Sequence, residues 1–355
     1  MCSKFGEDTT AMEVVEGISL RGYEVIVTGR NSGIGVETLR ALAKAGARCV
    51  LCTRDLEKGH HVAKELIAST KNDQIEVELD SLKSVDDFVE RFLAKKRPLN
   101  ILVNNAGVMA CPKSFTKNGF EKQFGINHLR HFALTIRLLP ALKEGAKQMS
   151  NKSRVINVSS TAHAFSNVDF NDIHFTKGRE YKRFVSYGQS KTCNFLFSLA
   201  LAKRFFNDGI ASNSVMPGNI IELIDENGKF LKKFKLVEAG ASTLVWAAVS
   251  PELEGKSGLY LENCSIGKEE SDIKKIRTII LGYAPFIMDD EAANKLWNIS
   301  EELLNNQTTL PSSISTPVLT IALQVEQFSP DLVNCHVEGN DHRKLILLEE
   351  IKQNN

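Results

Sequence analysis

The sequence lacks the features that mark several large classes of protein. Its seven cysteines are irregularly spaced along 355 residues, so they do not suit the disulfide framework of a small secreted domain. No window holds eighteen uninterrupted apolar residues, and the polar first residues lack the apolar core of a signal peptide. We therefore expect a protein that is not secreted, has no transmembrane anchor, and is cytoplasmic or peripherally associated with an organelle.

The chain also lacks an excess of charge of either sign. It carries 44 Lys and Arg against 43 Asp and Glu, a formal net charge of +1. A field this weak offers no general attraction to nucleic acid, so we expect no nucleic-acid partner. A metal site is not expected either, because Cys49 and Cys52 lie in an apolar run with no second Cys or His pair nearby. Buried thiols are favoured over a redox pair there.

What the chain has instead is an alternation of strand-like and helical segments. With 43% hydrophobic and 25% charged residues, it is expected to be globular. Strands are predicted at 23–28, 48–52, 75–79, 99–103, 154–158, 211–216 and 258–261, and helices at 33–45, 56–69, 85–94 and 184–206. This alternation predicts an α/β protein with a doubly wound parallel sheet, the Rossmann fold, in which ligands bind at the carboxyl ends of the strands.

One change in composition divides the chain. A linker-like run rich in Thr, Ser and Pro follows Gln307. We predict an N-terminal segment at 1–17, a single catalytic domain at 18–305 and a C-terminal appendage of unknown role at 306–355.

A glycine-rich turn joins the first predicted strand to the first long helix. Gly29, Gly33 and Gly35 permit close approach of the backbone to a ligand, and the helix that follows points its first amides at a pyrophosphate. The intervening residues of this loop are Arg30, Asn31, Ser32 and Ile34. A dinucleotide-binding loop is favoured, with a tight connection as the alternative.

The end of the second strand bears on the choice of dinucleotide. Arg54 lies nineteen residues after Gly35, and Arg30 lies inside the loop. Two guanidinium groups suit the 2′-phosphate of NADP(H). The alternative is that Asp55 binds a free ribose hydroxyl and the cofactor is NAD(H).

A tyrosine and a lysine lie four residues apart in the long helix predicted at 184–206. Tyr187 and Lys191 therefore share a face, and Ser160 follows a predicted strand. A free phenol has a pKa of about 10, so acid–base chemistry near pH 7 needs a shift of about 3 units. A lysine ammonium and the positive ring of an oxidised nicotinamide are sources of such a shift. The hydroxyl of Ser160 suits stabilisation of charge on a substrate oxygen.

These motifs together resemble the short-chain dehydrogenase/reductase family over about residues 18–305. The matching pieces are Thr28 to Gly35, Asn104 to Gly107, Asn127, Val158 to Ser160, Tyr187 to Lys191, and Pro217-Gly218. Further detail, such as the run from Asn127 to Phe132, is similar to the branch of retinol dehydrogenases and WW-domain oxidoreductases, here without a WW module.

The resemblance implies a role for each matching residue. Tyr187 would be the general acid and base, Ser160 would orient and polarise the substrate oxygen, and Lys191 would bind the nicotinamide ribose and lower the tyrosine pKa. Asn127 would hold the helix geometry and water of a proton relay. The cofactor would also contact Asp80, Asn105, Ala106, Gly107, Pro217, Gly218 and Ile220. The family further implies a possible homo-oligomer that uses the helix of Tyr187.

Four phenylalanines lie between the serine and the tyrosine: Phe165, Phe170, Phe175 and Phe184. They suit an apolar pocket for a retinoid, a steroid or a similar carbonyl, or they simply pack their loop onto the sheet. The expected function is interconversion of an alcohol and a carbonyl on a lipophilic substrate with NADP(H). The alternative is a catalytically silent, cofactor-binding scaffold or regulatory protein.

Overall fold

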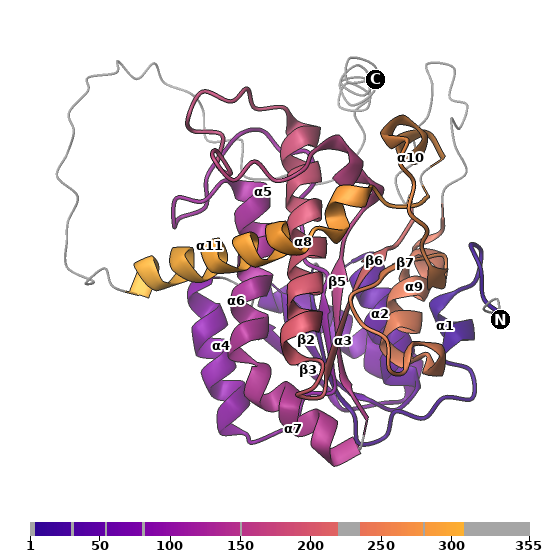
Figure 1. Cartoon of the computed structure of the whole chain (residues 1–355). Helices are drawn as coiled ribbons and strands as arrows, with labels where there is room; N and C mark the ends of the chain where they lie inside the picture. Colours follow the sequence, from indigo (N-terminus) through magenta and orange to yellow (C-terminus); the bar gives the residue numbers. More distant parts are fainter. Residues whose placement is uncertain are drawn as a thin grey trace, which may run out of the picture. The chain divides into compact units, whose positions relative to one another are not determined.

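A mixed sheet with strand order β3-β2-β1-β4-β5-β6-β7-β8 forms the centre of the fold (Figure 1). A computed structural model of the chain describes residues 4–29, 32–53, 55–79, 82–149, 151–218, 235–279 and 281–308. The strands are β1 (Glu24–Thr28), β2 (Arg48–Thr53), β3 (Ile75–Leu79), β4 (Ile101–Asn104), β5 (Ser153–Val158), β6 (Ile210–Met216), β7 (Tyr260–Glu262) and β8 (Ser265–Ile266). Pairing is parallel from β3 to β7, and β8 is antiparallel to β7.

Helices connect the strands, and their bounds follow in chain order. They are α1 (Ala11–Val14), α2 (Ile34–Lys44), α3 (Leu56–Thr70), α4 (Leu82–Ala94), α5 (Lys122–Phe124), the π-helix η1 (Gly125–Leu129), α6 (Arg130–Arg137), α7 (Leu139–Met149), the 3₁₀ turn η2 (Thr161–Phe165), α8 (Arg183–Phe205), α9 (Val237–Val249), the 3₁₀ turn η3 (Pro251–Leu253), α10 (Ile273–Ile279), the 3₁₀ turn η4 (Pro285–Met288) and α11 (Asp290–Thr308).

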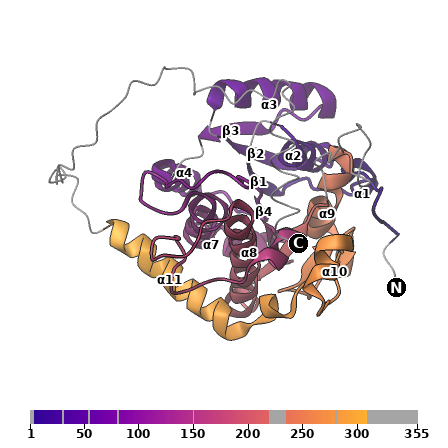
Figure 2. The same cartoon turned by 90° about the horizontal axis from the view of Figure 1, so that it is seen from above.

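Both faces of the sheet are covered, which explains why its strands are apolar along their whole length. In β1, Ile26 packs into a core with α4, α6, α7 and α8, whereas Val25 and Val27 pack into a second core with α2, α3 and α9. Figure 2 shows the helices on the two sides of the sheet. Alternate residues of a strand point to opposite faces, so a doubly covered parallel strand must be apolar on both. The predicted doubly wound fold is confirmed.

The two cysteines of β2 follow the same alternation. Cys49 belongs to the core beside α2, and Cys52 belongs to the core on the other face. Both are buried free thiols, so they cannot act together on one metal or as one redox pair. Across the described ranges, no group of three or more His, Cys, Asp or Glu is placed to hold a metal ion.

Helix α11 lies across the outer side of α6 and α8. Trp297 of α11 stacks edge-on against Phe132 with ring centroids 5.0 Å apart, and it also contacts Phe197 at 6.1 Å. Ser300 of the same helix is hydrogen-bonded to His128 at 2.9 Å. This side of α8 is therefore covered within the chain. The expected homo-oligomer and the domain boundaries at 17/18 and 305/306 stay predictions, and residues 309–355 lie outside the described ranges.

Among the helices that the structure describes, none is long and apolar enough to cross a membrane. The expected location in the cytoplasm or at an organelle surface stays a prediction.

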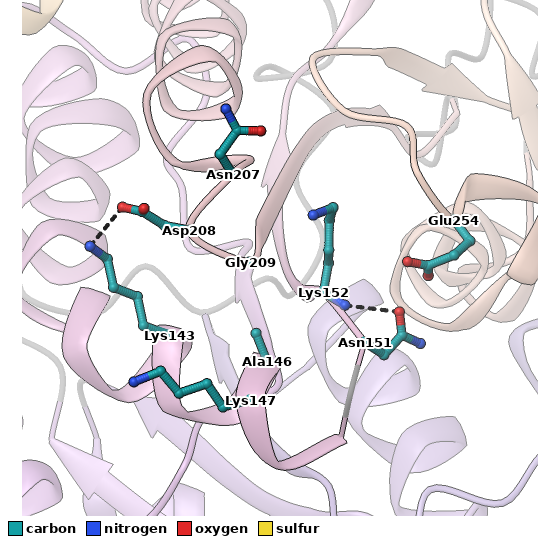
Figure 3. A pocket seen from close by; sticks show the side chains of 9 residues that line it. All are labelled: Lys143, Ala146, Lys147, Asn151, Lys152, Asn207, Asp208, Gly209 and Glu254. Atoms are coloured by element: carbon teal, nitrogen blue, oxygen red, sulfur yellow. Dashed lines mark hydrogen bonds and ion pairs between the residues drawn. The ribbon is translucent and has the colours of Figure 1, made fainter.

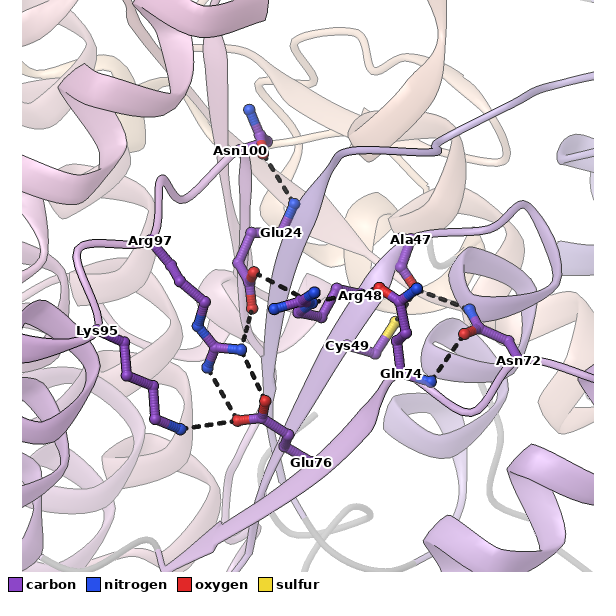
Figure 4. A network of polar contacts seen from close by, with 10 residues as sticks. All are labelled: Glu24, Ala47, Arg48, Cys49, Asn72, Gln74, Glu76, Lys95, Arg97 and Asn100. Carbon is purple, nitrogen blue, oxygen red and sulfur yellow. Dashed lines mark hydrogen bonds and ion pairs between the residues drawn. The ribbon is translucent and has the colours of Figure 1, made fainter.

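A charged network ties β1 and β3 together at their amino ends, opposite to the edge where ligands are expected (Figure 4). The carboxylate of Glu24 is almost fully buried and lies 3.5 Å from Arg97 and 4.0 Å from Arg48. Arg97 also donates two hydrogen bonds to the carboxylate of Glu76, of 2.7 and 2.8 Å. Burial raises the pKa of Glu24 to about 7, against the opposing pull of the two arginines.

This raised pKa predicts a specific pH dependence of stability. Folded Glu24 binds a proton more tightly than the unfolded chain does, so its contribution is present below about pH 4.5 and is lost as pH rises through 7. Wild type should therefore lose stability relative to Glu24→Gln as pH rises. We expect the difference in unfolding free energy, variant minus wild type, to increase by about 2 kcal/mol from pH 5 to pH 8, because each pKa unit corresponds to about 1.4 kcal/mol. Urea unfolding at both pH values measures this difference.

Glu76 provides the matched control for Glu24. Its hydrogen bonds to Arg97 and Lys95 lower its pKa to about 2, so its contribution is complete at both pH 5 and pH 8. Glu76→Gln should therefore lower stability by a similar amount at the two values. Parallel pH curves for Glu24→Gln and wild type would contradict the account of Glu24.

Candidate functional site

The glycine turn lies between β1 and α2, at the carboxyl edge of the sheet. Gly33 is the N-cap residue of α2, with φ +77°, and it has no side chain to cap the amides of the first helical turn. A Cβ atom at Gly33 would meet nothing within 4 Å, so the backbone there borders open space. Amides at a helix start that follows a glycine and borders open space suit a phosphate group. The sequence interpretation of a dinucleotide loop thus fits the local geometry.

The other two glycines of the turn allow a close approach by the loop after β4. A Cβ atom at Gly29 or Gly35 would lie 2.5 or 2.6 Å from Nδ2 of Asn105. That amide instead donates to the carbonyl of Thr28 at 2.9 Å. The backbone amides of Asn105 and Ala106 donate to Oγ1 of Thr28 at 3.0 and 3.1 Å. Asn105 and Ala106 are thereby fastened beside the glycine turn, and their contact with a cofactor stays a prediction.

Several predicted cofactor residues lie outside the described ranges, namely Arg30, Asn31, Arg54, Asp80 and Ile220. Asp55, the alternative ribose ligand, is described: its side chain caps α3 by accepting from the amide of Lys58 at 3.1 Å. Gly218, which is predicted to contact the cofactor, follows β6 and Pro217 with φ +101°. The stem of Lys235 fills the space where a Cβ atom of Gly218 would be.

Ser160 and Tyr187 meet at the carboxyl end of β5. Ser160 begins the turn η2, where its Oγ accepts from the amide of Ala162 at 3.1 Å, and its side chain lies near enough to Tyr187 to act on the pKa of that hydroxyl. Gly188 makes the approach of α8 possible, because a Cβ atom there would lie 2.4 Å from the carbonyl oxygen of Ala162. The neighbouring Ser159 is buried and donates to the carbonyl of Lys191 at 3.0 Å. The second serine is therefore the one that faces the tyrosine.

Lys191 lies one turn after Tyr187 on α8. Its ammonium donates to the carbonyl oxygen of Val158 at 2.9 Å and lies 5.4 Å from the centroid of the Tyr187 ring. Burial lowers the pKa of Lys191 to about 8. Burial also raises the pKa of Tyr187 to about 12, although the neighbouring Ser160 side chain opposes this rise. The protein by itself thus favours the neutral phenol, and the lowering of its pKa by Lys191 stays a prediction for the cofactor complex.

Asn127 lies in the π-helix η1, where the chain departs from regular α-helical hydrogen bonding. Its side chain accepts from the amide of Val108 at 2.8 Å and donates to the carbonyl of Val108 at 2.9 Å. It also donates to Oγ of Ser190 at 2.9 Å. Asn127 therefore fastens the segment after β4 to the helix that carries Tyr187. π-bulges within helices are frequent at functional sites of proteins.

Two buried histidines belong to this site although sequence reasoning missed them. His163 in η2 lies 2.7 Å from the carbonyl oxygen of Ser160, and its other ring nitrogen accepts from the amide of Ala284 at 3.0 Å. His131 contacts both Asn127 and Thr28. A signal for His131 was present, because residues 127 and 131 share a helix face. Nothing in the spacing pointed to the partner of His163 more than 120 residues away.

The four phenylalanines give more support to packing than to an open pocket. Phe175 is 1% exposed and stacks edge-on against Tyr181 at 5.2 Å, and Phe184 is 8% exposed beside Phe165. A cavity of about 540 Å³ lies elsewhere, at the amino ends of β5 and β6, lined by residues that include Lys147, Asn207 and Glu254 (Figure 3). It is remote from the glycine turn and plays no part in the site.

Comparison with known proteins agrees with this geometry. A family profile described as short chain dehydrogenase matches residues 24–172. Retinol dehydrogenase 12 of Mus musculus is 40% identical over 301 residues, which cover 82% of this chain and 89% of the relative. A short-chain dehydrogenase/reductase, prx1 of Penicillium roqueforti, is 37% identical over 292 residues, covering 79% and 84%.

Two solved structures are similar as well. A protein from Mycobacterium paratuberculosis has a TM-score of 0.64 at 29% identity, and the match covers 84% of this chain and 98% of that one. The active-site complex of Pseudomonas aeruginosa RhlG with NADP has a TM-score of 0.54 at 25% identity, covering 69% and 95%.

Proposed function

The chain belongs to the short-chain dehydrogenase/reductase family, as an oxidoreductase of the alcohol dehydrogenase type, and from this premise we propose that it interconverts an alcohol and a carbonyl on a lipophilic substrate with NADP(H). One observation carries the proposal: Ser160, Tyr187, Lys191 and Asn127 lie at the sheet edge where the glycine turn leads into the first amides of α2. The proposed catalytic domain is the predicted region 18–305.

In this proposal the nicotinamide cofactor, when bound, exchanges a hydride with the carbon atom of the substrate. The hydroxyls of Ser160 and Tyr187 are close enough to each other to reach one substrate oxygen together. Ser160 would donate a hydrogen bond to that oxygen, where negative charge develops during reduction. Tyr187 would give the oxygen its proton in reduction and take it back in oxidation.

Lys191 and Asn127 would support this proton transfer. The buried Lys191 ammonium lies beside the tyrosine ring, and a positive charge there stabilises the phenolate that forms when Tyr187 gives up its proton. Asn127 would keep the segment after β4 and the catalytic helix in register through its contacts with Val108 and Ser190. Gly29, Ser32, Gly33, Gly35 and the segment Asn105 to Gly107 would hold the dinucleotide.

The proposed preference for NADP(H) rests on two arginine charges near the cofactor loop and on the hydrogen bond that Asp55 makes to the first turn of α3. The side chain of Asp55 is committed to the first turn of α3 and to Lys58, which leaves it poorly placed to serve as a ribose ligand. Arg54 and Arg30 are the proposed partners of the 2′-phosphate. The related RhlG structure, 25% identical, carries NADP.

A titration with NADPH and NADH, followed by nicotinamide fluorescence, tests this preference. We expect tighter binding of NADPH than of NADH, and we expect Arg54→Ala to weaken NADPH at least tenfold while changing NADH less than twofold, because a hydrogen bond to a charged group is worth about 1.5–3 kcal/mol. Asp55→Ala should lower the melting temperature through loss of a helix cap and leave both affinities nearly unchanged. Tighter NADH binding that Asp55→Ala abolishes would reverse the assignment.

A turnover screen tests the proposed substrate class. The relatives named retinol dehydrogenase make retinal the first carbonyl to try, followed by steroid ketones and simple aldehydes. NADPH oxidation that depends on the lipophilic carbonyls is the expected result. Turnover of simple aldehydes alone would leave the reaction in place and contradict the lipophilic substrate.

A further inference from the structure

His131 is the first-turn histidine of α6, immediately after the π-helix, and only 2% of it is exposed. Its Nδ1 lies 2.9 Å from the carbonyl oxygen of Asn127. Its Nε2 lies 2.9 Å from Oγ1 of Thr28, the residue that precedes the glycine turn. One imidazole ring thus touches a backbone atom of the proposed relay residue and a side chain at the base of the cofactor loop.

The partners determine where the protons lie on this ring. A carbonyl oxygen can only accept, so Nδ1 carries the hydrogen and Nε2 is left as an acceptor. The Thr28 hydroxyl then donates to Nε2, while its oxygen accepts from the amides of Asn105 and Ala106. The carbonyl of Val103 is a poorer acceptor for this hydroxyl because it lies 3.4 Å away. Every polar atom in the chain of contacts is therefore used.

The surroundings keep the ring neutral. Burial and the nearby positive charges of Arg130 and Lys191 hold the pKa of His131 well below its ordinary range. A neutral imidazole has one donor and one acceptor, which the two contacts require. A protonated ring would present a second donor to Thr28, whose hydroxyl would then have to turn away.

We propose that His131 is a positioning residue that couples the cofactor loop to Asn127 through its two ring nitrogens. The proposal rests on the proposed function, in which the glycine turn binds NADP(H) and Asn127 serves the proton relay. The Nε2 contact orients Thr28 and, through it, the amides of Asn105 and Ala106 beside the dinucleotide. The Nδ1 contact fixes the Asn127 carbonyl at the π-bulge. The two contacts therefore serve different steps, which are binding and chemistry.

Two substitutions separate the contacts, because an Asn amide ends near the position of Nδ1 and a Gln amide reaches near that of Nε2. His131→Asn keeps a donor for the Asn127 carbonyl and loses the partner of Thr28. We expect its NADPH dissociation constant to rise about fivefold to tenfold, with kcat within threefold of wild type. His131→Gln keeps the partner of Thr28 and loses the contact with Asn127. We expect kcat to fall at least tenfold, with the NADPH dissociation constant within threefold.

His128 is the matched control, since it is buried on the same segment but bonds to Ser300 of α11. His128→Asn and His128→Gln should lower the melting temperature without separating binding from turnover. Thr28→Val removes the hydroxyl without touching the histidine, and it should reproduce the binding defect of His131→Asn. Both changes break the same contact between Thr28 and His131. The double variant Thr28→Val/His131→Asn should therefore have an NADPH dissociation constant no higher than that of the more weakly binding single variant.

The outcomes are distinct. Equal effects of His131→Asn and His131→Gln on both constants, or no effect of either, would overturn the coupling while wild type still binds NADPH and turns over. Additive effects of Thr28→Val and His131→Asn on the NADPH dissociation constant would overturn the coupling too. This second test does not need His131→Gln, so it applies even where that variant does not fold. Failure of the wild-type protein to bind either dinucleotide would instead refute the proposed function, and the coupling with it.

Discussion

Tyr187→Phe is expected to reduce turnover about a thousandfold while leaving NADPH affinity and the melting temperature close to wild type. Only the hydroxyl is removed, so the ring keeps its place on α8 beside Lys191. Loss of a positioned general acid or base typically costs a factor of 10²–10⁴. Steady-state kinetics, cofactor titration and thermal unfolding of the same preparation measure the three quantities.

Tyr181→Phe is the control for this experiment. Tyr181 is a half-buried tyrosine nearby, and its hydroxyl donates to the carbonyl of Cys111 at 3.0 Å and accepts from Gln123 at 3.0 Å. Its removal should cost stability but change kcat less than threefold. A Tyr187→Phe protein that retains more than a tenth of wild-type turnover would show that another group transfers the proton.

Ser160→Ala is expected to lower kcat by a factor of about 10²–10³ with a smaller effect on KM. A hydroxyl that bonds to the substrate oxygen most strongly when charge has developed contributes to the transition state more than to the bound substrate. Ser160 also caps η2, so Ala costs some stability as well. Ser160→Thr retains the hydroxyl and should recover much of the turnover, which separates chemistry from capping.

Ser159→Ala distinguishes the two adjacent serines. The hydroxyl of Ser159 is directed at the carbonyl of Lys191, away from Tyr187, so its loss should cost about 1 kcal/mol of unfolding free energy and change kcat only a few-fold. If Ser159→Ala were the variant that loses two orders of magnitude in kcat, the assignment of the two serines would be reversed.

The sequence was sufficient for the sheet because burial on both faces leaves a local signature. The apolar runs predicted at 23–28 and 154–158 are the strands Glu24–Thr28 and Ser153–Val158. The Tyr187–Lys191 pair was readable because helical spacing puts the two residues on one face. The fourth and seventh strands begin two residues later than predicted, at Ile101 and Tyr260. Gly258 has φ +75°, which lies outside the extended region of a strand.

Long-range contacts explain what the sequence could not provide. The bonds of Asn127 in the π-helix to Val108 and Ser190 join segments that are 19 and 63 residues apart. The raised pKa of Tyr187 is a consequence of burial in the folded chain, which spacing alone does not reveal.

The most direct test of hydride transfer at this site uses NADPH that carries deuterium at the transferable position of its nicotinamide, with retinal as the carbonyl. The account predicts retinol with one deuterium at the carbinol carbon, formed in a one-to-one ratio to oxidised cofactor, and at most about a thousandth of that rate with Tyr187→Phe. Cofactor that binds to the wild-type protein but never delivers deuterium to retinal or to any carbonyl of the panel would contradict it.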